Sequence, residues 1–73
     1  MVTLNGDEVN LAGKTISEYL STTEYKKEQV AVEVNYVIIP KSDYDSLVLK
    51  DNDIVEVVCF MGGGSQNFHK LNF

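Results

Sequence analysis

Two reactive side chains occur only once each in this sequence, the thiol of Cys59 and the imidazole of His69. A hydrolytic cysteine–histidine pair needs hydrogen-bond contact between the two groups and a third group that orients the base. Cys59 alternates with Val55 and Val57 in an apolar stretch, which predicts a buried, structural cysteine. His69 follows a glycine run, where a mobile surface imidazole is expected. The sequence therefore does not favour cysteine–histidine catalysis.

The remaining chemical candidates are carboxylates and glycines. Asp51 and Asp53 resemble a fragment of a calcium loop, but the glycine and the distal glutamate of that motif are missing, so a solvated turn is favoured. The run GGGS lacks the lysine and hydroxyl of a phosphate loop. Such a run is either a flexible connector or an arm, about 10 Å long for three residues, that can thread a channel too narrow for side chains.

The first half of the chain predicts a hairpin followed by a helix. Alternating apolar residues predict short strands on both sides of Asn5-Gly6, a pair that favours a tight turn. Thr15 and Glu18 have the spacing of a helix capping box, and apolar residues at helical spacing follow. The predicted helix continues to about Lys27.

The second half predicts three more strands. Residues 30–34 alternate between apolar and mixed positions, and a short continuation after the weak turn signal Asn35-Tyr36 ends at Pro40. Ser42 or Asp43 is expected to cap a single helical turn, and a polar turn precedes a final strand over residues 54–60. The order β-β-α-β-β-β predicts an α+β roll, a mixed sheet of four to five strands with one main helix packed on one face. A right-handed crossover is expected to put the strand after the helix beside the first strand, in parallel.

Composition narrows the classes of function. A chain of 73 residues suits one small domain, which buries about 60% of its unfolded surface. The formal net charge of −5 argues against a nucleic-acid partner. No apolar run approaches the roughly 20 residues of a membrane span, and the start of the chain lacks the pattern of a signal peptide. The single cysteine provides neither a disulfide nor a zinc framework and suits a reducing, cytoplasmic setting.

Three stretches together, in this order and spacing, carry a resemblance to a known family: LNGDEVNL, TISEYL and VAVEVNYVIIPKSDYDSLVLKDNDIVEVVCFMGGG. They resemble the ThiS sulfur-carrier family of thiamine biosynthesis over residues 1–64. The resemblance implies a β-grasp, ubiquitin-like domain over residues 1–61, which agrees with the predicted roll. It further implies a glycine arm over residues 62–64 and a flexible C-terminal extension over residues 65–73.

The resemblance also implies a carrier that partner enzymes act upon, not an enzyme. In the family a ThiF-like adenylating enzyme activates the C-terminal glycine carboxylate with ATP and magnesium, so the carrier itself is expected to bind no cofactor. Sulfur, usually drawn from cysteine through a cysteine desulfurase, then forms a thiocarboxylate. A ThiG-like thiazole synthase accepts this sulfur.

The resemblance assigns site residues by position. Gly64 is expected to supply the acyl carbon, with Gly63 as the alternative terminus, and Gly62 and Gly63 form the threaded arm. Since Val58 and Phe60 alternate away from the core-facing residues, they and Met61 either form a docking patch for a partner or are buried under a loop.

The chain departs from the family pattern at two main places. Tyr36 stands where a glycine is common, which predicts an altered hairpin. The stretch SQNFHKLNF follows Gly64, and a peptide-bonded glycine has no carboxylate to adenylate. We therefore expect a protease to remove residues 65–73. Two alternatives remain open, a MoaD-like sulfur carrier for molybdopterin synthesis and a ubiquitin-like interaction module that carries no sulfur.

Overall fold

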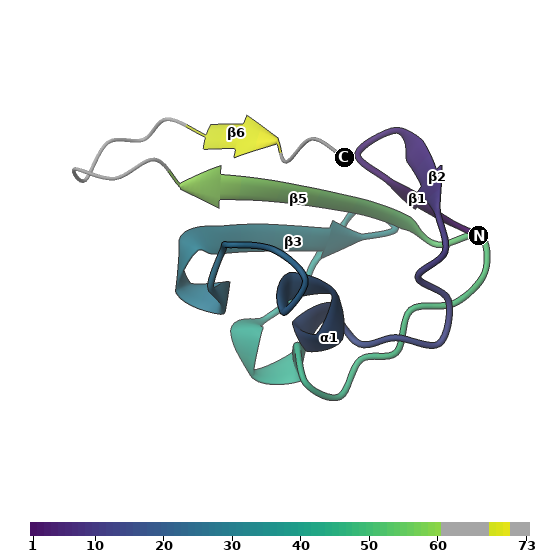
Figure 1. Ribbon diagram of the computed structural model, residues 1–73, viewed down its shortest axis with the longest axis horizontal. Helices are drawn as coiled ribbons and strands as arrows, with labels where there is room; N and C mark the ends of the chain where they lie inside the picture. Colours follow the sequence, from purple (N-terminus) through teal and green to yellow (C-terminus); the bar gives the residue numbers. More distant parts are fainter. Residues whose placement is uncertain (61–67, 71–73) are drawn as a thin grey trace.

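The computed structural model describes residues 1–60 and 68–70. A mixed sheet forms one layer, with the strand order β2-β1-β5-β3-β4 and with β6 also paired to β5. A short helix, α1, lies against the sheet (Figure 1). The strands are β1 Val2–Leu4, β2 Asp7–Val9, β3 Val30–Val34, β4 Val37–Ile38, β5 Ile54–Phe60 and β6 Phe68–Lys70. The helices are α1 Ile16–Leu20 and two 3-10 turns, Lys27–Gln29 and Lys41–Asp43.

Two tight hairpins follow from residues that adopt left-handed backbone geometry. Asn5 and Gly6 have φ of 50° and 91°, so the predicted Asn-Gly turn between β1 and β2 is confirmed. Asn35 and Tyr36 have φ of 51° and 69° and join β3 to β4 in the same way. Two successive positive φ values match the twist of antiparallel strands. At Tyr36 this geometry is strained, because a side chain with a Cβ rarely adopts it.

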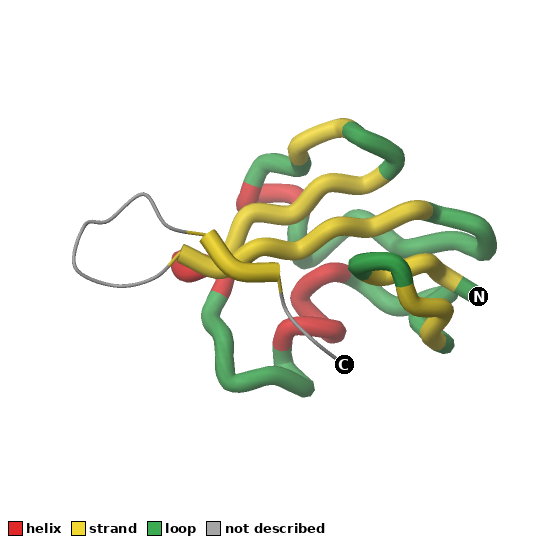
Figure 2. Tube along the Cα trace, turned by 90° about the horizontal axis from the view of Figure 1, so that it is seen from above, coloured by secondary structure: helices red, strands yellow, loops and turns green. Residues whose placement is uncertain are grey.

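Strand β5 lies at the centre of the sheet, between β1 and β3 (Figure 2). It pairs in parallel with β1, where Leu4 lies opposite Val55, and antiparallel with β3, where Val34 lies opposite the same residue. The prediction that the strand after the helix lies beside the first strand was wrong. The crossover rule applies only to two parallel neighbouring strands. The parallel neighbour of β1 is β5, which separates β1 from β3.

Helix α1 begins as predicted but ends earlier. The Thr15 hydroxyl accepts from the Glu18 N–H at 3.1 Å, and the Glu18 carboxylate accepts from the Thr15 N–H at 2.8 Å, which confirms the capping box. The helix ends at Leu20, so the prediction of a helix to about Lys27 was wrong. Hydroxyls of the next residues, Ser21 among them, donate to carbonyl oxygens three positions back and so compete with helical hydrogen bonds.

The predicted single helical turn exists, but its start differs from the prediction. It is the 3-10 turn Lys41–Asp43, which begins after Pro40 without a side-chain cap, so neither Ser42 nor Asp43 caps it. Proline suits this position because its fixed φ fits a helix start and it has no N–H to satisfy.

The core lies between the sheet and α1 with its following loops. The buried apolar residues are Val2, Leu4, Ile16, Tyr19, Leu20, Val30, Val32, Val34, Tyr44, Leu49, Val55, Val57 and Cys59. Those from β3 and β5 alternate along each strand, which confirms that Val55, Val57 and Cys59 face the interior. The predicted α+β roll with one main helix on one face of a mixed sheet is therefore confirmed.

Candidate functional site at the end of strand β5

The site begins where β5 ends, because the glycine run follows this strand with only Met61 between them. Met61, Gly62, Gly63, Gly64 and the side chain of Phe60 lie outside the described residues, so their predicted roles stay predictions. The structure does describe the residues around the end of β5, at Cys59. These residues hold the strand that precedes the predicted arm.

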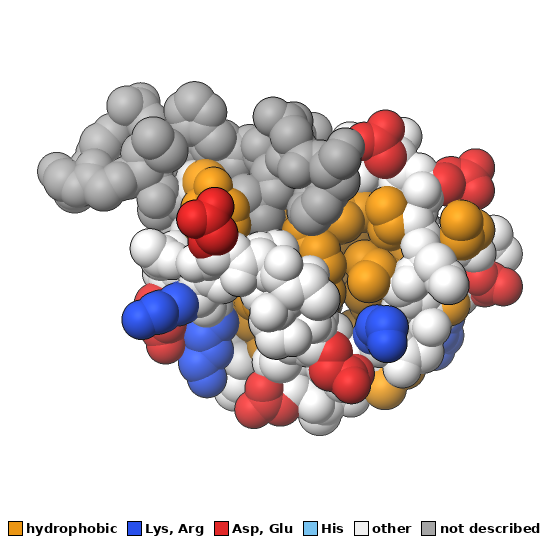
Figure 3. All heavy atoms as spheres, viewed as in Figure 1, with side chains coloured by type: hydrophobic (Ala, Val, Ile, Leu, Met, Phe, Trp, Pro, Cys, Tyr) orange, Lys and Arg blue, Asp and Glu red, His pale blue; other side chains and the backbone are white. Residues whose placement is uncertain are grey.

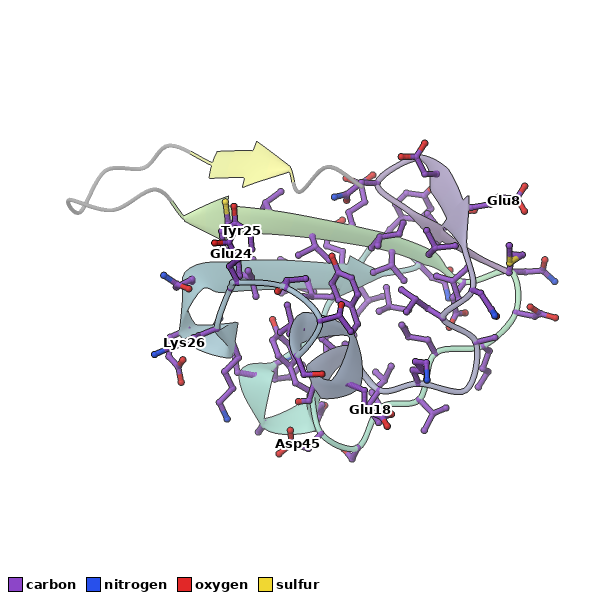
Figure 4. All side chains as sticks on the ribbon, viewed as in Figure 1. Glu8, Glu18, Glu24, Tyr25, Lys26 and Asp45 are labelled. Atoms are coloured by element: carbon purple, nitrogen blue, oxygen red, sulfur yellow. The ribbon has the colours of Figure 1, made fainter. Side chains whose placement is uncertain are left out.

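Cys59 is a free, buried cysteine with 4% of its surface exposed. Its predicted structural role agrees with this burial. Tyr25 lies beside the end of β5 (Figure 4), where its hydroxyl interacts electrostatically with Cys59. Electrostatic repulsion from Cys59 raises the pKa of the Tyr25 hydroxyl above its usual value, and Glu24 adds to this effect.

Lys41 supports the neighbouring strand at the same end of the sheet. Val30 lies opposite Cys59 in the β3–β5 ladder. The Lys41 ammonium donates to the Val30 carbonyl oxygen at 2.9 Å and lies 5.8 Å from the centre of the Tyr44 ring. A hydrogen bond from a charged donor is stronger than a neutral one, so Lys41 anchors the start of β3 beside the base of the arm.

On the edge that faces β1, the backbone of β5 is hydrogen-bonded partly by a side chain. The Asn5 N–H donates to the Val55 carbonyl oxygen at 2.9 Å, and there β1 ends. The Asn5 side-chain amide then continues the pairing, because its Nδ2 donates to the Val57 carbonyl oxygen at 3.1 Å and its Oδ1 accepts from the Val57 N–H at 2.9 Å. A side chain thus satisfies two backbone groups that a longer β1 would otherwise bind.

Beyond Asn5, part of the stretch after Gly64 takes over this edge. Strand β6 pairs antiparallel with β5, with Val58 opposite Lys70, Cys59 opposite His69 and Phe60 opposite Phe68. The ribbon shows β6 alongside the far end of β5, on the side away from β3 (Figure 1). Within residues 65–73, for which the sequence predicts a flexible extension, the structure gives Phe68–Lys70 a place in the sheet. Residues 65–67 and 71–73 lie outside the described part of the chain.

The predicted docking patch is only partly described. Val58 is half-buried and lies between Ala31 of β3 and Lys70 of β6, while Phe60 and Met61 cannot be placed on a surface from the described side chains. Among the described residues, large exposed apolar side chains also occur at the opposite end of the sheet, on the β3–β4 hairpin. They are Tyr36, Val37 and Ile38.

On the face drawn in Figure 3, the carboxylates of the described residues are dispersed among other side chains. Asp53, one of the two residues that resemble a calcium loop, accepts hydrogen bonds from the Asn35 amide at 3.0 Å and from the Lys50 N–H at 2.8 Å. Its role is that of a turn residue. Within residues 1–60 no three metal-binding side chains of the kind His, Cys, Asp or Glu come together. The helices of that part of the chain are too short or too polar to cross a bilayer.

The sequence pattern gives no indication that three residues contribute to this site: Tyr25, Lys41 and Asn5. Lys41 lies in a polar stretch to which the sequence assigns no role of its own. Asn5 was assigned to its turn, and its second contact joins residues 52 positions apart, for which local pattern gives no signal. Tyr25 fell within the helix that was predicted too long, so its contact with the end of β5 was not anticipated.

Comparison with known families places this chain near one group of proteins. The model of the ThiS family matches residues 2–64, and the match ends at the third glycine. A crystal structure of a thiamine biosynthesis protein (ThiS) from Geobacter metallireducens has 36% identity and a TM-score of 0.68, covering 86% of this chain and 97% of that one. This likeness confirms the β-grasp arrangement implied by the earlier resemblance.

Curated relatives agree over almost the same region. The sulfur carrier protein ThiS of Bacillus subtilis is 38% identical over 66 residues, with 88% of this chain and all of that protein covered. The thiazole synthase of Paramagnetospirillum magneticum is 41% identical over 63 residues, which cover 85% of this chain. The chain spans only 19% of the length of that thiazole synthase, and the same share of a second one from Magnetococcus marinus.

Proposed function

Because the chain belongs to the ThiS family, we propose that it is a sulfur carrier protein of thiamine biosynthesis, acted on by partner enzymes and not itself catalytic. The observation that carries this proposal is the extent of the family match, which begins at residue 2 and stops at Gly64. The relatives named sulfur carriers are covered over their full length.

The chemistry we propose takes place at the carboxylate of Gly64. An ionised carboxylate, with a pKa of about 3.3–3.7, is a poor acyl donor. A ThiF-like enzyme would join it to the α-phosphate of ATP, with magnesium, and release pyrophosphate. A persulfide formed on a cysteine desulfurase would then displace AMP to give an acyl disulfide, and reduction of its S–S bond by cellular thiols would leave the thiocarboxylate. The carrier holds neither ATP nor magnesium of its own in this scheme.

The carrier contributes reach and placement to this reaction. The last residues of β5 pair on one side with β3, whose first residue accepts a hydrogen bond from Lys41, and Tyr25 lies near Cys59. The origin of the arm is therefore fixed, while Gly62 and Gly63 lack side chains that would obstruct a narrow active-site channel. Whether Gly63 or Gly64 bears the sulfur depends on where the chain is cut, and Gly64 is our assignment because the family match ends there.

Thiazole synthase is the proposed acceptor of the sulfur. In two proteins named thiazole synthase, a region similar to this chain makes up 19% of a longer polypeptide. A carrier-like region and a thiazole synthase name thus occur together in one protein, which supports a ThiG-like partner here. The docking patch of Val58, Phe60 and Met61 at the base of the arm is proposed as its contact surface, and the reducing cytoplasm as the location.

The residues after Gly64 require a processing step in this proposal. Ser65 is bonded to Gly64, so no carboxylate exists there until that bond is hydrolysed. We assign this step to a protease. The alternative, an interaction module that carries no sulfur, would keep residues 65–73 in place, and their partial integration into the sheet as β6 is the observation in its favour.

ATP–pyrophosphate exchange with a ThiF-like enzyme separates these alternatives. The chain ending at Gly64 should support exchange, and the 73-residue chain should not, because only the former has the glycine carboxylate. A chain ending at Gly63 serves as the matched comparison for the position of the terminus. If the Gly64-terminated chain is folded but supports no exchange, the interaction module is the better account.

A further inference from the structure

One edge of β5 is covered by three different groups in succession. The backbone of β1 covers it as far as Val55, and the Asn5 side chain covers Val57. Strand β6 covers the stretch from Val58 to Phe60. The edge nearest the glycine arm is therefore occupied by residues that lie after the arm in the sequence.

Alternation along β5 identifies the backbone groups that β6 covers. The backbone groups of Val55 and Val57 point toward β1 and Asn5, so those of Cys59 point toward the same edge. The opposite edge is filled by β3, where Val30 lies opposite Cys59. In the register of β6 the Cys59 groups face His69. Without β6 the N–H and C=O of Cys59 would form an unpaired strand edge at the base of the arm.

The pairing of β6 with β5 is short, and a short segment of the same chain connects the two strands. In the described part of the chain, three residues, Phe68–Lys70, take part. Seven residues, 61–67, join the paired positions Phe60 and Phe68, and a short link of this kind gives an effective concentration on the order of millimolar. A free peptide would have to offset its lost translational freedom with the same few hydrogen bonds, which is more than such a short strand provides.

We propose that β6 occupies the Cys59 edge of β5 only while it is tethered, so that a cut within residues 61–67 releases it and opens this edge for pairing with an extended segment of the protein that receives the arm. Exposed strand edges are ready sites for strand addition. If the cut falls after Gly64, one hydrolysis both creates the carboxylate and uncovers a recognition surface beside it. That last consequence rests on the proposed function, while the tethered pairing does not.

Amide hydrogen exchange at Cys59 tests the proposal without any partner enzyme. We compare the 73-residue chain, the chain ending at Gly64, and that shorter chain mixed with the peptide SQNFHKLNF at about 0.1 mM, below the effective concentration of the tether. Exchange at Cys59 should be at least about tenfold slower in the 73-residue chain than in the other two samples. The Val57 amide, bonded to Asn5, should stay protected in all three and reports that the fold is intact.

Proline substitutions in β6 provide a matched pair within the full chain. In this register the His69 N–H faces β5, whereas that of the next residue, Lys70, faces away. His69→Pro should therefore abolish the protection of Cys59, and Lys70→Pro should retain most of it. Equal exchange at Cys59 in the 73-residue and Gly64-terminated chains would contradict the pairing, and protection restored by the free peptide would contradict its dependence on the tether. Either result leaves sulfur carriage itself untouched.

Discussion

The side-chain amide of Asn5 binds both backbone groups of Val57, with Nδ2 3.1 Å from the carbonyl oxygen and Oδ1 2.9 Å from the N–H. Asn5 also has a positive φ of 50° in the β1–β2 turn. One residue therefore ends the first strand, starts the hairpin and supplies the pairing that β1 is too short to give. The central strand keeps its hydrogen bonds between β1 and β6 through this contact.

Asn5→Gly should destabilise the fold. Glycine accepts the positive φ without strain, so the substitution removes only the side-chain amide and leaves part-buried groups of Val57 unpaired. The expected loss is about 1–3 kcal/mol in the free energy of unfolding, measured by urea denaturation. Asn52→Gly is the matched control, since Asn52 is exposed and has a φ of 73°. Equal stability of the two variants would contradict the role of the Asn5 amide.

Tyr36→Gly should stabilise the fold. Tyr36 is 74% exposed and has a φ of 69°. The substitution therefore removes little packing and relieves the strain of a left-handed backbone conformation. The strain is about 1–2 kcal/mol, and glycine costs roughly 0.5–1 kcal/mol in added chain entropy. The net gain should be about 0.5–1 kcal/mol, seen as a higher denaturant midpoint with an unchanged slope. Val37→Gly, at the exposed neighbouring strand position, should instead lower the midpoint, and a loss in Tyr36→Gly would show that the turn is not strained.

Thr15→Ala should weaken the entry into α1. The substitution removes the hydroxyl that accepts from the Glu18 N–H, in a helix of only five residues. The expected cost is about 1 kcal/mol in the free energy of unfolding. Thr15→Ser keeps the hydroxyl and should stay close to the parent protein. Thermal denaturation of the three proteins decides the point, and an Ala variant as stable as the Ser variant would argue against the cap.

Stability should fall at alkaline pH because two buried tyrosines stay neutral in the fold. Burial raises the pKa of the Tyr19 hydroxyl, and burial likewise raises the pKa of the Tyr44 hydroxyl. The unfolded chain releases these protons near pH 10. The folded state holds them more tightly, so their contribution is complete below about pH 10 and is lost progressively as pH rises from that value toward the raised pKa values of the folded state.

Urea denaturation from about pH 8 to about pH 11 measures this loss. Tyr19→Phe should reduce the slope of stability against pH in the upper part of the range. Tyr36→Phe, at a largely exposed position, should leave the slope unchanged. A slope that does not change in Tyr19→Phe would contradict the assignment to the buried hydroxyl.

Local pattern was sufficient for most elements of this fold. The Asn5-Gly6 turn, the Thr15 capping box and the alternation of Val55, Val57 and Cys59 each depend on residues close in sequence. The predicted end of the helix was wrong because the hydroxyls of Ser21 and its neighbours compete for helical carbonyl groups. The periodicity of apolar residues gives no sign of this competition. The prediction of the strand order was wrong because the alternation of apolar residues locates strands but does not say which strand lies next to β1.

The site was predicted by its position in sequence and not by its surroundings. The glycine run after β5 predicts an arm that ends at Gly64, and the family match ends at the same residue. The contacts of Asn5 and Lys41 with distant backbone groups, and the pairing of Phe68–Lys70 with β5, join segments that no local pattern connects. Such contacts depend on the assembled sheet.

The most direct test of sulfur carriage is the intact mass of the protein after incubation with a ThiF-like enzyme, ATP, magnesium and sulfide. We predict that the chain ending at Gly64 gains the mass of one oxygen-to-sulfur exchange. The 73-residue chain should stay unchanged in the same mixture and gain this mass only after hydrolysis of the Gly64–Ser65 bond. A 73-residue species that acquires sulfur and supports thiazole formation uncut, or a folded Gly64-terminated chain that acquires none, would contradict the account.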